Sequence, residues 1–189
     1  IGRCVMEEGV RQYAKWRQNH DNSMVLYINV SAIQYMRDGF VDELLQVLST
    51  YQVHPQEVEL EITESILIED FEKVTAKLRS LRSYGIRVSL DDFGTGFSSL
   101  SYLKKLPIDT LKIDKSFIDT VLSDGATRVI TESIISIVRT LGLETIAEGV
   151  EQEQQYKYLH AIGCDIIQGY YFGRPLPVQE MEALLDKLA

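Results

Sequence analysis

Short runs of apolar residues alternate along the chain with longer segments whose apolar residues recur at helical spacing. The short runs predict strands at Met24–Val30, Val58–Thr63, Ile86–Asp92, Thr110–Asp114, Glu144–Val150 and Asp165–Phe172. The longer segments predict helices at Ile1–Gln18, Ala32–Thr50, Phe71–Tyr84, Leu100–Lys105, Ala126–Leu141, Gln152–Ile162 and Val178–Leu188. No linker or low-complexity segment divides the chain, so we expect one domain over residues 1–189.

Strands that alternate with helices pair in parallel, in either a doubly wound sheet or a barrel. A polar residue stands near the end of every predicted strand: Asn29, Glu61, Asp91, Lys112, Glu148 and Gln168. A doubly wound sheet gathers ligands mainly at one switch point, whereas a barrel directs every strand at one central site. The pattern therefore favours a TIM-like (β/α) barrel.

Alternation within the strands indicates which side chains face the barrel interior. Lys112 has the opposite parity to its apolar neighbours, so it is expected inside with the other polar residues. Tyr27, Ile146 and Ile166 are expected to fill a lower interior layer, and Glu59 is interpreted as a solvated acid. A complete barrel has eight strands and about 250 residues. We therefore expect an incomplete barrel whose first two strands precede Ile1.

The charge and the cysteine content limit which classes of partner and which cellular compartment are expected. The formal net charge of -9 would repel a phosphate backbone, which disfavours DNA as a partner. No apolar run reaches the length of a membrane span, so we expect no membrane contact by this domain. Two cysteines, Cys4 and Cys164, are too few for a disulfide framework, so we expect the domain in the reducing cytoplasm. A membrane-anchored parent protein is compatible with this location.

Two adjacent carboxylates, Asp91 and Asp92, end the third predicted strand, and a turn with Gly94 and Gly96 follows. Considered without the rest of the chain, these two carboxylates are explained by a solvated turn. Other strand ends add further oxygen donors, and such a set suits Mg²⁺ or Mn²⁺. The added donors are Asn29, Glu61 and Glu148.

An adjacent acidic pair can serve two metal ions, and two-metal sites commonly hydrolyse phosphate esters. Lys112 would hold a phosphate oxygen or the attacking water, or it would neutralise the surrounding acids. The two roles of Lys112 are compatible. Asp-Phe-Gly at Asp92–Gly94 is also a motif of protein kinases, but the other kinase motifs do not accompany it in the sequence. We therefore do not interpret the chain as a kinase.

Six motifs together resemble the EAL-domain family of bacterial phosphodiesterases, which hydrolyse cyclic di-GMP to its linear dinucleotide. They are NVS at 29–31, EITES at 61–65, DDFGTGFSSL at 91–100, LKID at 111–114, AEGVE at 147–151 and GCDIIQGYYFGRPLP at 163–177. The resemblance extends over essentially the whole chain in the family order.

The resemblance implies that Asn29, Glu61 and Asp91 bind a first Mg²⁺ or Mn²⁺ ion, and that Asp91 and Asp92 bind a second. It implies that Glu148 acts near the second metal and as a candidate base, and that Lys112 positions the water. Further members of the site would be Glu151 and Gln168 in a hydrogen-bonded shell, and Glu64 at the loop that begins at Asp92 and contains Gly94 and Gly96.

The Glu-Ala-Leu motif that names the family lies on an early strand, and none of the strands predicted here contains it; the Glu-Ala-Leu at 182–184 falls within the last predicted helix. In the family its glutamate binds metal, so we expect the isolated chain to be impaired and a longer parent protein to be active. The alternatives are a non-catalytic cyclic di-GMP receptor or interaction scaffold, and an unrelated Mg²⁺ barrel enzyme. The resemblance also implies a homodimer and sensor or cyclase domains in the parent chain.

Overall fold

A parallel sheet with strand order β1-β2-β3-β4-β5-β6 forms the centre of the protein. The computed structural model describes residues 2–20, 24–68, 70–94 and 103–188. The strands are β1 (Leu26–Val30), β2 (Val58–Thr63), β3 (Arg87–Phe93), β4 (Thr110–Ile113), β5 (Glu144–Ala147) and β6 (Ile166–Ile167). The helices are α1 (Gly2–Asn19), α2 (Ala32–Met36), α3 (Phe40–Thr50), η1 (Pro55–Glu57), η2 (Glu64–Ile68), α4 (Phe71–Ser83), α6 (Lys115–Thr120), α7 (Gly125–Thr140), α8 (Glu153–Ala161) and α9 (Val178–Leu188).

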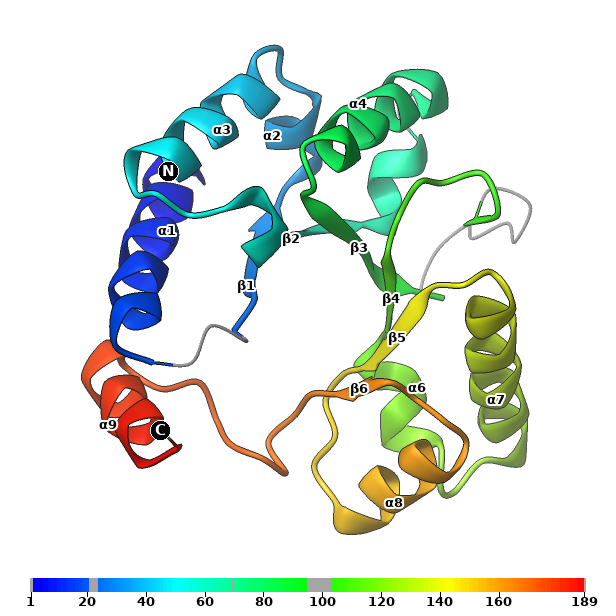
Figure 1. Cartoon of the computed structure of the whole chain (residues 1–189). Helices are drawn as coiled ribbons and strands as arrows, with labels where there is room; N and C mark the ends of the chain where they lie inside the picture. The colour runs from blue at the N-terminus through cyan, green and yellow to red at the C-terminus, as the bar shows by residue number, and fades with distance from the viewer. Residues whose placement is uncertain (1, 21–23, 69, 95–102, 189) are drawn as a thin grey trace.

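The sheet curls, and the long helices lie around its outer side (Figure 1). This is an incomplete TIM-like α/β barrel, as the sequence predicts. All strand pairs are parallel, with Asn29 opposite Glu61 and Thr63 opposite Asp91. The carboxyl ends of the strands consequently lie along one rim.

The two faces of the strands differ in chemistry. The face toward the helices is apolar and fully buried, with Leu60, Leu90 and Leu111 on successive strands. The opposite parity carries Glu61 and Lys112, which are also buried although they are charged. Because a buried charge is costly unless it is paired, this interior face must supply its own partners.

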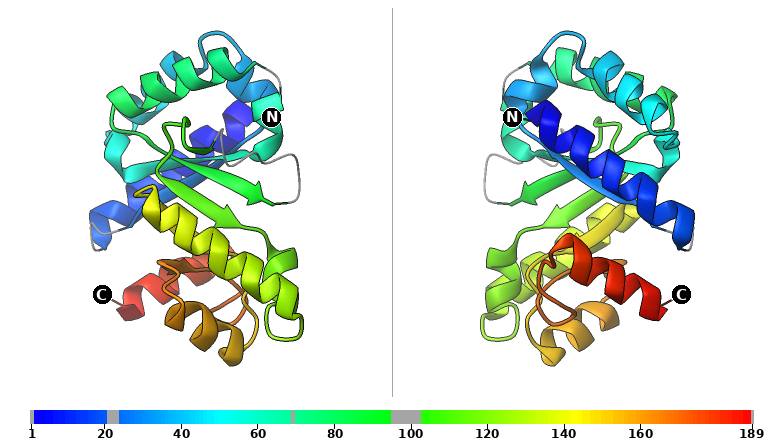
Figure 2. Two further views of the ribbon diagram at one scale, coloured as in Figure 1. Left: turned by 90° about the vertical axis from the view of Figure 1, so that its right-hand side faces the viewer. Right: turned by 90° about the vertical axis from the view of Figure 1, so that its left-hand side faces the viewer.

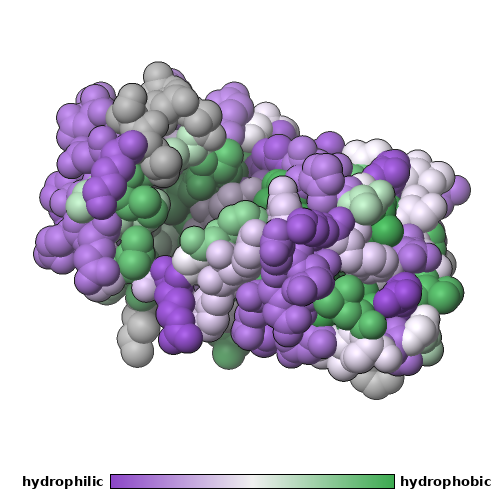
Figure 3. All heavy atoms as spheres, turned by 90° about the horizontal axis from the view of Figure 1, so that it is seen from below, coloured by the Kyte–Doolittle hydropathy of each residue, from purple (hydrophilic) through white to green (hydrophobic). Residues whose placement is uncertain are grey.

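Contacts between the first and last helices complete the helical ring. Gln12 and Trp16 of α1 both donate hydrogen bonds to Glu182 of α9, over 3.2 and 3.3 Å, and the two helices lie next to each other (Figures 1 and 2). The sheet does not close in the same way, since no described strand pairs with the outer edge of β1 or β6. Seen from below, the molecule is hollowed, and hydrophobic residues line part of the hollow (Figure 3).

The open sheet changes one expectation about the interior layer. Ile146 is buried as predicted, but Tyr27 and Ile166 are 38% and 37% exposed. Both residues lie on edge strands, where no further strand covers them. The prediction that all three fill the interior is therefore wrong for the two edge positions.

Several predicted element boundaries also differ. The helix predicted through Thr50 is two helices, α2 and α3, because Arg37 leaves the helical conformation. The last predicted strand reduces to β6, since the chain turns after Ile167. Residues 100–102 of the helix predicted at Leu100–Lys105 lie outside the described residues. Within the described ranges, no helix is long and apolar enough to cross a membrane.

Candidate active site at the carboxyl ends of the strands

The end of β3 brings two carboxylates together with a third from the segment after β5. Asp91, Asp92 and Glu148 each offer a carboxylate oxygen, and these oxygens all lie within 4.8 Å of one another. Pairing between β3 and β4 shifts register between Leu90 and Phe93, which re-aims the end of the strand. Asp92 has a positive φ of 57°, and its N–H donates to Asp91 Oδ1 over 3.0 Å.

Lys112 lies on β4 at the centre of the carboxylates. Its Nζ is 2.6 Å from Glu148 Oε1, 2.7 Å from Glu61 Oε1 and 3.3 Å from Asp91 Oδ1, and its side chain is 3% exposed. Burial acts to lower the pKa of this ammonium, but the hydrogen bonds to Glu148 and Glu61 outweigh it and raise the pKa above its ordinary value. Lys112 therefore stays charged and partly neutralises the acids around it.

The carboxylates remain in excess over this single cation. Burial raises the pKa of Glu148, and Asp91 and Glu61 raise it further, against the opposing effect of Lys112. Burial and the neighbouring Asp91 likewise raise the pKa of Asp92. Clustered carboxylate oxygens with surplus negative charge are the donor set that Mg²⁺ and Mn²⁺ prefer, so the residues fit such ions.

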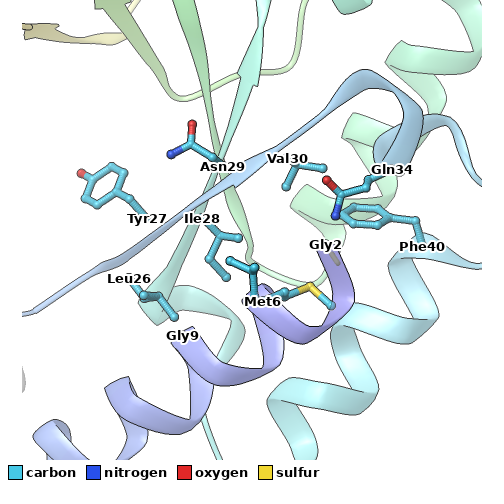
Figure 4. Close-up of a pocket in the computed structure, with 11 residues that line it drawn as sticks. Gly2, Met6, Gly9, Leu26, Tyr27, Ile28, Asn29, Val30, Gln34 and Phe40 are labelled. Atoms are coloured by element: carbon cyan, nitrogen blue, oxygen red, sulfur yellow. The ribbon is translucent and has the colours of Figure 1, made fainter. Parts of the chain in front are cut away.

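Asn29 and Glu61 stand opposite each other on β1 and β2. Glu61 is buried and reaches the carboxylates through Lys112. Asn29 is exposed on the edge strand. Figure 4 shows Asn29 and Tyr27 pointing away from α1, whereas Ile28 points toward it. A pocket of about 370 Å³ lies between α1 and β1, lined by Gly2, Val5, Met6, Gly9, Leu26, Tyr27, Ile28, Asn29, Val30, Gln34 and Phe40.

Glu64 contacts the start of the loop after β3. It is buried, and its Oε2 accepts a hydrogen bond from the N–H of Gly94 over 3.4 Å. Gly96 lies outside the described residues. Within the described residues, Glu64 therefore contacts this loop at Gly94.

Glu151 and Gln168 share a second pocket next to the carboxylates. It has a volume of about 290 Å³ and is lined by Lys115, Glu148, Gly149, Glu151, Gln168, Gly169 and Tyr170. The backbone N–H of Gln168 donates to the Ala147 carbonyl over 2.9 Å, which attaches this segment to the end of β5. Of the lining residues, Lys115 was not singled out from the sequence, because its partners are apparent only in the folded chain.

The structure also corrects the interpretation of Glu59 as a solvated acid. It is fully buried rather than solvated, and its Oε2 lies 3.0 Å from Arg87 Nε. Burial raises the pKa of Glu59, against the effects of Thr110 and Arg87. The residue lies at the opposite end of the barrel interior from Asp91, so it is separate from the carboxylates at the rim.

Comparisons with known proteins give one family. The family model described as the EAL domain matches residues 1–175. The oxygen sensor protein DosP of Escherichia coli K12 is 39% identical over 188 residues, which are 100% of this chain and 24% of DosP. MucR of Pseudomonas aeruginosa, a bifunctional diguanylate cyclase/cyclic di-GMP phosphodiesterase, is 38% identical over 97% of this chain and 27% of MucR. The chain spans about a quarter of the length of these curated relatives.

Solved structures agree. The EAL domain of DcpA from Mycobacterium smegmatis has a TM-score of 0.94 and 39% identity, over 99% of this chain and 84% of that one. The PaMucR phosphodiesterase in complex with c-di-GMP has a TM-score of 0.92 and 38% identity, over 96% and 73%. Klebsiella pneumoniae BlrP1 with manganese and cyclic di-GMP has a TM-score of 0.83 and 27% identity, over 92% and 44%.

Proposed function

Because this chain belongs to the EAL domain family, we propose that it hydrolyses cyclic di-GMP to the linear dinucleotide, and that residues 1–189 act as one phosphodiesterase unit. The observation that carries the proposal is the buried Lys112, held within 3.3 Å of Glu61, Asp91 and Glu148 at the strand ends. A single carboxylate would balance the charge of a purely structural lysine. Three carboxylates around it, with Asp92 beside them, instead suit a centre that binds cations and a phosphodiester.

We assign the metal-binding role to Asn29, Glu61, Asp91, Asp92 and Glu148, with two Mg²⁺ or Mn²⁺ ions. When bound, such ions would lower the pKa of a coordinated water and neutralise charge on the phosphate. Manganese in the related BlrP1 complex supports a divalent ion.

The remaining roles follow from charge and position. Lys112 keeps its proton, so it can hold a water or a phosphate oxygen by donating a hydrogen bond. Glu148 has a raised pKa, which suits a base that takes the proton from the attacking water. As the water oxygen bonds to phosphorus, the bond from phosphorus to the leaving ribose oxygen breaks, and this oxygen takes a proton from solvent to become the free hydroxyl of the linear dinucleotide. Glu151 and Gln168 face the adjoining pocket and complete the polar lining.

The test is turnover of cyclic di-GMP with Mn²⁺, followed by chromatography of the linear product. Asp91→Asn and Lys112→Ala are expected to abolish hydrolysis, since each removes a charge from the centre of the site. Arg174→Ala is the matched control. The guanidinium of Arg174 lies 4.9 Å from the centre of the Tyr170 ring, and Arg174 is not one of the residues that form the carboxylate cluster. Retained turnover in the Asp91 variant would exclude the two-metal mechanism, and tight binding without turnover would identify a receptor.

We also propose that the 189 residues alone hydrolyse slowly. None of the described strands carries the Glu-Ala-Leu motif, and the Glu-Ala-Leu at 182–184 is in α9, so one expected carboxylate ligand is missing. Reading the gene upstream of the Ile1 codon, and comparing turnover of the longer product with that of this chain, tests this. Equal rates would contradict it.

Three further features belong to the same proposal. The sensor and cyclase functions named for DosP and MucR support a place within a larger signalling protein, which we assign to the cytoplasm. The third is a homodimer, in which Val129 and Ile130 of α7, 62% and 46% exposed, would offer apolar contacts. Light scattering of the purified protein measures the oligomeric state, and a monomer at micromolar concentration would argue against the dimer.

A further inference from the structure

Lys115 connects α6 to the segment that carries Glu151. Its Nζ lies 2.9 Å from Glu151 Oε1 and 2.6 Å from Asp119 Oδ1. Asp119 is one turn further along α6, so it holds the ammonium on the helix side while Glu151 approaches from the segment between β5 and α8. Lys115 and Glu151 both line the pocket beside Glu148.

Gly149 makes this contact possible. It has a positive φ of 71°, and a Cβ added there would lie 2.4 Å from Lys115 Cγ. The stem of Lys115 therefore passes directly over the backbone between Glu148 and Glu151. A residue with a side chain at this position would displace the lysine and with it the ion pair.

Gln155 attaches the backbone of Glu151 to the same helix. Its Oε1 accepts hydrogen bonds from the N–H groups of Glu151 and Gln152, each over 2.9 Å. Its Nε2 donates to the Ile118 carbonyl of α6 over 2.9 Å, and the side chain is buried. Glu151 is thus fixed to α6 twice, through its backbone by Gln155 and through its carboxylate by Lys115.

We propose that Lys115 is a positioning residue, which holds the Glu151 carboxylate in the pocket beside Glu148 during hydrolysis of cyclic di-GMP. The inference rests on the proposed function. Lys115 acts through Glu151 rather than on the phosphate, because two carboxylates already surround its charge and leave the group of three with a net charge of about -1. The pair is about half exposed, so its role is orientation rather than stability.

The test compares Lys115→Met and Lys115→Arg with Lys157→Met. Lys157 forms an exposed ion pair with Glu153 at 2.7 Å on α8 and lines no described pocket, so it is a matched control. We expect Lys115→Met to lower kcat roughly tenfold, with KM within about twofold, because a misplaced group loses its orientation. Lys115→Arg should recover most of kcat, and Lys157→Met should leave both constants and Tm unchanged.

The outcomes separate the positioning role from its alternatives. A higher KM at unchanged kcat would show that Lys115 touches the substrate, and unchanged constants would show no role; either result overturns the inference. If the starting protein does not hydrolyse cyclic di-GMP, the proposed function fails. The crystal structure of Lys115→Met then decides: a displaced Glu151 carboxylate supports the positioning role, and an unmoved one overturns it.

Discussion

Replacing Lys112 by methionine should destabilise the protein strongly in the absence of metal ions. Methionine keeps an unbranched apolar stem of similar length, so the change removes mainly the charge. Lys112 is 3% exposed, and its Nζ lies within 3.3 Å of three carboxylates that would lose their partner. Removing one partner of a buried ion pair costs about 3–5 kcal/mol. For a chain of this size that corresponds to a fall in Tm of roughly 6–20 °C.

The assay is thermal unfolding followed by circular dichroism, with a chelator present. The loss should shrink as the pH falls from about pH 8 to about pH 5, because the raised pKa of Glu148 means that the folded variant takes up protons more readily than the unfolded chain. Mn²⁺ should raise the Tm of the variant more than that of the starting protein, since it replaces the missing positive charge.

Lys157→Met is the control, because its ion pair with Glu153 is exposed and screened by water. A fall in Tm for Lys112→Met no larger than that of this control would refute the reasoning. So would a loss that stays constant across the pH range, because uncompensated carboxylates must respond to protons.

Three other substitutions test the same region, and Gly9→Ala on α1 is the control for the first of them. Gly169→Ala places a Cβ 2.1 Å from the Val150 carbonyl oxygen and should cost about 3 kcal/mol, seen as a lower Tm; Gly9→Ala, with nothing within 4 Å, should leave Tm unchanged or higher. Gln155→Leu removes three hydrogen bonds and should cost about 3 kcal/mol in chemical denaturation. Asp92→Asn should weaken Mn²⁺ binding about tenfold or more, measured by calorimetry.

Each of these has a result that would count against it. Equal Tm values for Gly169→Ala and Gly9→Ala would mean that the loop at Val150 yields freely. An unchanged denaturation midpoint for Gln155→Leu would mean that water replaces its hydrogen bonds. Unaltered Mn²⁺ affinity in Asp92→Asn would remove that residue from the proposed metal ligands.

Local pattern was sufficient for most of the fold. The alternation that placed Leu111 toward the helices and Lys112 toward the interior is present in the structure, because parity in a strand is a local property. β6 was overestimated, since Gly169 packs against Val150 and the chain turns there rather than continuing the strand. A glycine inside the predicted strand was the available signal.

Some residues of the candidate site could likewise be predicted from local sequence, and others could not. Asp91 and Asp92 are adjacent in the sequence, and their place at a strand end could be predicted. Lys115 could not be found in this way, because its contact with Glu151 depends on the course of the chain over Gly149. Glu59 was misjudged for a similar reason: its partner Arg87 is on the neighbouring strand, and only the register brings them together.

The strand order has a consequence for synthesis on the ribosome. Each strand from β2 to β6 pairs with the strand that precedes it in the sequence. Every rung of the sheet can therefore form as soon as its segment emerges, without waiting for a distant part of the chain, which lowers the contact order. The contacts of Gln12 and Trp16 with Glu182 are different, because they join helices at the two ends of the chain and must form last. A nascent chain released after β6 would already hold all six described strands, with α1 not yet in contact with α9.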